Sequence, residues 1–149
     1  MREVLSNDSL FARRKFCVCD CYIDRISLDE DTVTFHFSEG FSLIEGETIY
    51  HTQSGQVRIL GVSSADISCW IIKRRATKQG AKQYGKPVEV EKLLQMMERK
   101  KLRIELFVEM YDAYRFHWRG SFFPCGRRRL STLVVFEVTD EFALEYTWR

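Results

Sequence analysis

Apolar and polar residues alternate along most of this chain with a period of two, which is typical of strands that bury one face. The clearest example is TVTFHF at 32–37, where Val33, Phe35 and Phe37 fall on one side and polar residues on the other. From the alternating segments together we expect about eight strands. These segments are 16–26, 32–37, 41–52, 56–62, 102–111, 114–123, 130–138 and 142–148. Residues 66–73 are instead nearly continuous in apolar residues, which predicts a central strand buried on both faces.

One segment has the period of an α-helix instead. Between 89 and 100, Val90, Leu93, Leu94 and Met97 recur at the spacing that builds one apolar helix face. Acidic residues lie near its start and basic residues near its end, which suits the helix dipole. A single helix is therefore predicted two thirds of the way along the chain.

The connections between successive strands are short, which indicates antiparallel pairing. The predicted fold class is α+β, with a predominantly antiparallel sheet and one inserted helix near 89–100. A strongly curved sheet, a sandwich and an open barrel are all compatible with this pattern. We expect one globular domain over 1–149, because this length suits a single core. Residues 73–86 break the pattern and are expected to form a long basic loop that is free to move.

The segments 102–111 and 114–123 predict a hairpin that turns near Asp112. If Met110 pairs with Tyr114, both faces of the hairpin acquire matched partners. On the apolar face Val108 opposes Phe116, Leu106 opposes Trp118 and Leu102 opposes Phe122, and on the polar face Glu109 opposes Arg115 and Glu105 opposes Arg119.

The polar face of this hairpin is a candidate pocket, with Trp118 beside it. Its residues are Glu105, Glu109, Arg115 and His117. Cross-strand charge pairs on a solvated sheet are one interpretation, and paired carboxylates for acid/base chemistry are the other if the face lines a cleft. A cavity between sheet and helix would also need apolar walls, for which Phe35, Phe37, Trp70 and Trp118 are the candidates.

Three cysteines stand at alternate positions, Cys17, Cys19 and Cys21. On a regular strand such residues are about 6.5–7 Å apart, which is too far for an unstrained disulfide or a shared zinc ion. The spacing therefore predicts that the three thiols share the inward face of a strand with Ile23, buried, reduced and free of metal. A metal or redox role would require a loop in place of the strand.

Charge is segregated along the chain, although the net charge is only +2. Six acids and no Lys or Arg lie between 26 and 57, whereas six bases and no acid lie between 73 and 86. Residues 127–129 are three further arginines. Opposed surface charges steer association with a protein partner, and basic segments beside aromatic residues bind nucleic acid. A solvated polar loop is the alternative without a ligand.

We therefore expect a non-catalytic protein-interaction module, an adaptor or an inhibitor-type partner, whose partner is another protein. Its predicted binding residues are Arg74, Arg75, Tyr84, Arg127 and Arg128. Nucleic-acid binding through 73–86 and 127–129 is the first alternative function. A small-ligand or enzymatic cavity is the second.

Several function classes lose support from what the chain lacks. The sequence has no HExxH, nucleophile elbow or phosphate loop, so no catalytic residue, metal site or cofactor is predicted. It also has no apolar run long enough for a signal peptide or a membrane span. A cytoplasmic protein is the resulting expectation, with the oligomeric state left open.

Overall fold

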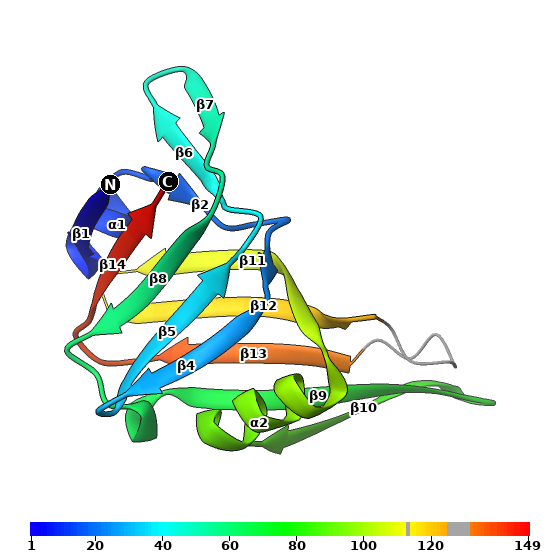
Figure 1. Cartoon of the computed structure of the whole chain (residues 1–149). Coiled ribbons are helices and arrows are strands. Elements are labelled where there is room, and N and C mark those ends of the chain that lie inside the picture. The colour runs from blue at the N-terminus through cyan, green and yellow to red at the C-terminus, as the bar shows by residue number, and fades with distance from the viewer. Residues whose placement is uncertain (113, 125–131) are drawn as a thin grey trace.

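The computed structural model describes residues 1–112, 114–124 and 132–149. These residues form fourteen strands in three antiparallel sheets, together with two α-helices and one 3-10 turn (Figure 1). The first sheet has the order β1 (Arg2–Ser6), β14 (Ala143–Trp148), β8 (Gly55–Leu60), β5 (Thr32–Phe37), β4 (Arg25–Asp29). The second has the order β10 (Gly80–Pro87), β9 (Ser68–Thr77), β13 (Thr132–Val138), β12 (Arg115–Phe123), β11 (Arg103–Asp112), β3 (Tyr22–Ile23). The third has the order β2 (Phe16–Cys17), β6 (Ser42–Glu45), β7 (Thr48–His51), and the helical elements are α1 (Asn7–Ala12), η1 (Ser64–Asp66) and α2 (Val90–Lys100).

The α+β class and the predominance of antiparallel sheet are confirmed. The expected numbers of about eight strands and one helix are wrong, because several alternating segments are divided by turns and the polar N-terminal residues form β1 and α1. The described strands also form three separate open sheets, and none of these is strongly curved.

Aromatic rings from the two larger sheets meet in the core. The Phe35 ring from β5 lies 5.1 Å from Trp118 and 5.0 Å from Phe136, measured between centroids, and both partners belong to the second sheet. The last strand buries its alternate residues as predicted: Phe142, Leu144, Tyr146 and Trp148 are all at most 7% exposed. Each such side chain contributes about 1.5–3 kcal/mol when fully buried, so these rings hold the two sheets together.

The predicted helix is confirmed as α2, which begins at Val90 and ends at Lys100. It buries Val90, Leu93 and Met97, three of the four residues of the predicted apolar face, and packs against β4. Lys101 adopts the left-handed conformation with φ 52° and its backbone N–H bonds to the last turn, which ends the helix.

The hairpin of β11 and β12 forms, but the predicted register is wrong. Asp112 pairs with Arg115, and Glu109 lies opposite Trp118 instead of Arg115. The ladder shifts by one residue between Leu106 and Val108. An extra residue in one strand reverses which side chains face inward. Glu109 therefore points into the protein, although the alternation placed it on a polar face.

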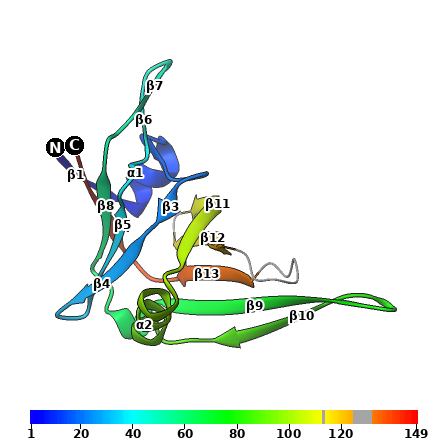
Figure 2. The ribbon, with the colours of Figure 1, turned by 45° about the vertical axis from the view of Figure 1, so that its right-hand side comes forward.

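Residues 73–86, expected to be a loop, form the outer part of the β9–β10 hairpin, and we call these residues the arm. The two strands pair from Trp70 and Pro87 at the base to Thr77 and Gly80 at the tip. The hairpin extends well beyond the other strands of its sheet (Figures 1 and 2). Every residue of β10 is exposed, so no apolar alternation could mark this segment as a strand.

The segment 66–73 was expected to be a strand buried on both faces, and this is also incorrect. β9 has only β10 on its outer side, and β10 is the edge of the sheet. Cys69 is 2% exposed on the face toward the core, whereas Trp70 on the other face is 41% exposed.

Candidate functional site

Cross-strand pairing distributes the arm's cations over its two faces. Residues directly opposite each other in an antiparallel pair project to the same side. Arg75 faces Lys82 and Lys73 faces Tyr84, whereas Arg74 lies on the other face opposite Gln83. One face of the arm is therefore strongly basic with a central tyrosine.

The arm's cations form no ion pairs with acidic residues in the described part of the chain. Among the described residues, no ion pair involves Lys73, Arg74, Arg75, Lys78, Lys82 or Lys86. Five of the ten described arginines outside the arm form ion pairs, for example Arg2 with Glu145 and Arg103 with Glu39. The opposition of Arg75 and Lys82 is also unfavourable for the isolated ribbon, since like charges directly opposite destabilise a sheet. These charges are exposed, so an external anion can reach them.

Aromatic side chains accompany this charge. Tyr84 is 55% exposed on the basic face, and Trp70 is 41% exposed at the base of the arm. Trp70 and Lys86 line a surface hollow there together with Glu89 and Glu91, at the start of α2. Arg74, Arg75 and Tyr84 thus lie on one exposed structure. The other two predicted binding residues, Arg127 and Arg128, lie outside the described residues.

The structure separates the residues of the candidate pocket. Arg115 and His117 both contact Glu137 on β13, with a His117 Nδ1 to Glu137 oxygen distance of 3.2 Å. Glu105 lies opposite Ser121 on the partner strand. The contacts of Arg115 and His117 with Glu137 join neighbouring strands of one sheet. They fit the interpretation of this face as a set of cross-strand charge pairs, although with other partners than predicted.

Three of the four apolar residues suggested for a cavity wall meet, but as a filled core. Phe35, Phe37 and Trp118 pack ring against ring in the core, whereas Trp70 lies on the outer face of β9.

Glu109 and Trp118, the remaining two residues of that pocket, belong to a buried polar network. The Glu109 side chain is 0% exposed. Its carboxylate accepts hydrogen bonds from the Arg14 guanidinium at 2.9 Å, the Val18 N–H at 2.9 Å and the Tyr111 hydroxyl at 2.7 Å. Trp118 Nε1 donates to the Tyr111 oxygen at 3.0 Å. Sequence alternation missed this network because the shift after Leu106 turned Glu109 inward.

The cysteine segment is a turn and not a regular strand. β2 ends at Cys17, and the turn after it contains Asp20, whose φ of 63° lies in the left-handed region. The Cys21 N–H bonds to the Val18 carbonyl, which closes a tight turn, and the Asp20 N–H bonds to the Leu106 carbonyl. The predicted phase is therefore wrong for the first two thiols: Val18 is fully buried, Cys17 and Cys19 are only half-buried, and Cys21 is buried. The geometric objection to a shared thiol site depended on a regular strand and no longer applies.

The turn brings two thiols to the buried carboxylate. The Cys17 sulfur, the Cys19 sulfur and a Glu109 oxygen all lie within 4.8 Å of one another, and we call these three residues the thiol–carboxylate cluster. Burial and the nearby Glu109 charge raise the pKa of Cys17, and the same causes raise the pKa of Cys19 to about 11. Burial is also the main reason why the pKa of Cys21 rises to about 12.

The raised pKa values predict slow alkylation of these thiols in the metal-free protein. A shift of the Cys19 pKa from 9.0 to about 11 lowers the thiolate fraction at neutral pH about 100-fold, and the thiolate is the nucleophile. We expect iodoacetamide to label Cys19 about 100-fold more slowly than an unperturbed peptide thiol, as measured by peptide mass spectrometry.

The Glu109→Gln variant removes the neighbouring charge and should label Cys19 severalfold faster than the wild type. Cys69, which is 2% exposed, serves as the internal reference for folding and should remain slow in both proteins. Equal Cys19 rates in the two proteins, with Cys69 protected, would show that Glu109 does not influence the thiols.

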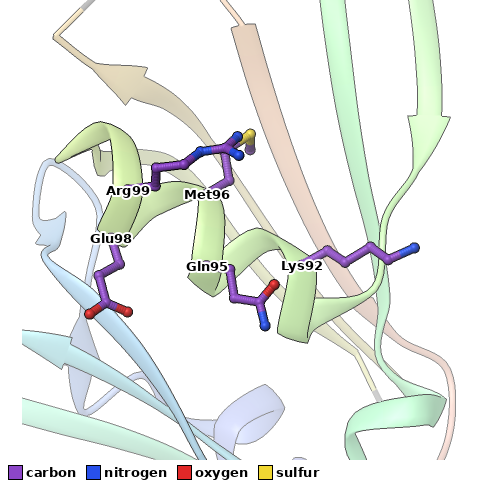
Figure 3. Close-up of a pocket in the computed structure, with 5 residues that line it drawn as sticks. All are labelled: Lys92, Gln95, Met96, Glu98 and Arg99. Carbon is purple, nitrogen blue, oxygen red and sulfur yellow. The ribbon is translucent and has the colours of Figure 1, made fainter.

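The solvent face of α2 does not gather its side chains around a ligand. Lys92, Gln95, Met96, Glu98 and Arg99 line a shallow depression there. Figure 3 shows that Gln95 and Glu98 point to one side of the helix and that Met96 and Arg99 point to the other. Because these side chains diverge, we place no site on this face.

No protein-family model, curated protein sequence or solved structure matches this chain. Within the described ranges, no helix is both long and apolar enough to cross a membrane. Function is therefore inferred from the geometry of the arm and of the thiol–carboxylate cluster.

Proposed function

We propose that this protein is a non-catalytic interaction module that binds an acidic surface of another protein through its arm. The observation that carries this proposal is the set of six arm cations that form no ion pair with any described residue, on a ribbon that projects from the body. Complementary charge on a partner would remove the repulsion between Arg75 and Lys82 and would steer association.

Two further features favour a protein partner over nucleic acid. β10 is an edge strand, and an edge offers backbone N–H and C=O groups on which another chain can add a strand. In addition, Glu89 and Glu91 lie beside Lys86 and Trp70 in the hollow at the arm's base. These carboxylates would repel a phosphate backbone that continued along the arm, whereas a protein surface can present charges of both signs.

Charge reversal on the arm tests this function. The variant Arg74→Glu, Arg75→Glu, Lys82→Glu should weaken partner binding by about 100-fold or more. Each substitution replaces an ion pair worth up to about 1 kcal/mol with a repulsive contact. A loss of 1.4 kcal/mol of binding free energy corresponds to a tenfold loss of affinity. The matched control reverses three exposed cations of α2, Lys92, Arg99 and Lys100, which changes the net charge equally and should leave binding intact.

The measurement is photo-crosslinking from position 83, an exposed, uncharged site on the arm, in lysate of the source organism with and without nuclease. A discrete protein crosslink that resists nuclease, disappears in the arm variant and persists in the α2 variant is the expected result. A crosslink to DNA or RNA, or one abolished by nuclease, would assign the arm to nucleic acid and overturn the proposal. Equal crosslinking in the three proteins would exclude the arm as the binding surface.

A further inference from the structure

The thiol–carboxylate cluster joins two parts of the chain that are far apart in sequence. Cys17 ends β2, Cys19 lies in the turn after it, and Glu109 comes from β11. Their three potential ligand atoms lie within 4.8 Å of one another. In a tetrahedral zinc site with Zn–S bonds of about 2.3 Å, ligand atoms are about 3.5–4 Å apart. The half-buried thiols therefore need to move by only about 1 Å, which a small side-chain rotation provides.

Glu109 is held in position by groups that would form the outer shell of a metal site. A carboxylate has about four positions for accepting hydrogen bonds, and Arg14, Val18 and Tyr111 occupy three of them. The Cys17 and Cys19 sulfurs lie beside this carboxylate, each within 4.8 Å of one of its oxygens. A divalent ion bound between these three atoms would displace the two thiol protons, because thiols coordinate metals as thiolates.

The charges around the cluster suit a divalent cation. Two thiolates and one carboxylate carry three negative charges, which one divalent ion and the Arg14 guanidinium would neutralise together. Arg14 already contacts Glu109 at 2.9 Å, so the compensating charge is in place. The site with its ion would then carry no net charge, which matters because an unpaired charge is costly to bury.

We propose that Cys17, Cys19 and Glu109 bind a thiophilic divalent cation such as Zn²⁺, with one coordination position left open. Thiolate and carboxylate ligands together suit Zn²⁺ better than Ca²⁺ or Mg²⁺, which take oxygen ligands. The ion would tie the N-terminal turn to β11. This site is separate from the arm and does not depend on the function proposed for it.

Cobalt spectroscopy provides the test, on tag-free, full-length, reduced protein from which metal has been removed with a chelator. A Cys125→Ser background removes the one thiol outside the described residues. We expect one equivalent of Co²⁺ to produce a thiolate charge-transfer band and the visible bands of tetrahedral cobalt, and Zn²⁺ to displace it. Competition with a chromophoric chelator then gives the Zn²⁺ affinity.

The variants Cys17→Ser and Cys19→Ser should each lose most of the charge-transfer intensity and weaken Zn²⁺ binding by about 100-fold or more, since loss of an outer-shell partner alone costs about 10–100-fold. Glu109→Gln should keep the band but bind more weakly. Cys69→Ser and the arm variant are the matched controls and should bind like the wild type. Circular dichroism checks folding, and Cys19→Ser, at a half-exposed turn position, is the variant least able to disturb the core.

Three outcomes would overturn the proposal. The first is the absence of a charge-transfer band in the wild-type protein. The second is unchanged Zn²⁺ affinity in the folded Cys19→Ser and Cys17→Ser variants. The third is a reduced protein that binds no metal but forms a Cys17–Cys19 disulfide on oxidation, which would make the pair a redox site.

Discussion

Replacing Glu109 by alanine is expected to lower the free energy of unfolding by about 2–4 kcal/mol, because each buried donor left without its acceptor costs about 1–3 kcal/mol. The Glu109 side chain is 0% exposed. Its loss leaves the Arg14 guanidinium, the Val18 N–H and the Tyr111 hydroxyl without their common acceptor. The effect should appear in urea denaturation of protein kept metal-free with a chelator, so that loss of a bound ion cannot contribute.

Two further variants on β11 distinguish loss of the buried network from the effect of any substitution in this strand. Glu109→Gln keeps the shape and one acceptor oxygen, and should cost about 1–3 kcal/mol. Glu105→Ala removes a carboxylate that is only partly buried and should change stability by less than about 0.5 kcal/mol. If Glu109→Ala proved no more harmful than Glu105→Ala, the buried network would have no role in stability.

Replacing Trp118 by alanine is the second large effect, with an expected loss of about 3–5 kcal/mol. The Trp118 ring is 0% exposed. Its centroid lies 4.8 Å from that of Phe116 and 5.1 Å from that of Phe35, so it links neighbouring rings in both large sheets. Alanine would leave a large cavity at this junction and would remove the hydrogen bond from Nε1 to Tyr111.

Urea denaturation also measures this prediction. Trp118→Phe keeps most of the packed volume and should lower the free energy of unfolding by about 1–3 kcal/mol. Trp70→Ala is the matched control, since this indole is 41% exposed, and its cost should be about 1 kcal/mol or less. Similar losses in Trp118→Ala and Trp70→Ala would contradict the assignment of Trp118 to the centre of the core.

The two sites differ in what they do for the fold. The arm consists of exposed side chains whose charges have no partners in the described protein, so its sequence can be altered with little effect on stability. The thiol–carboxylate cluster instead includes the buried Glu109 carboxylate, which accepts hydrogen bonds from Arg14, Val18 and Tyr111. Reversal of the arm's charge should therefore change binding without changing urea stability, whereas changes at Glu109 should affect stability first.

Local periodicity was sufficient to predict α2 and β14. Val90, Leu93 and Met97 repeat at helical spacing, and the alternate residues of β14 from Leu144 onward are all buried. In both elements a single apolar face decides the structure, and that face is visible in the order of the residues. The segregation of charge into 73–86 could likewise be read directly from the chain, because it needs no knowledge of the fold.

The tertiary structure alone decided where Glu109, Cys17 and Cys19 lie. One extra residue after Leu106 reverses the inward face of β11, and a turn that contains the left-handed residue Asp20 interrupts the strand that the cysteines were expected to share. Both irregularities are stabilised across the chain, since the backbones of Asp20 and Cys21 bond to that of Leu106. A two-residue period contains no sign of such bonds, because they join segments more than eighty positions apart. The order of residues along the chain therefore predicted the charge of the arm. Long-range backbone pairing made the arm a two-stranded ribbon and brought two thiols to a buried carboxylate.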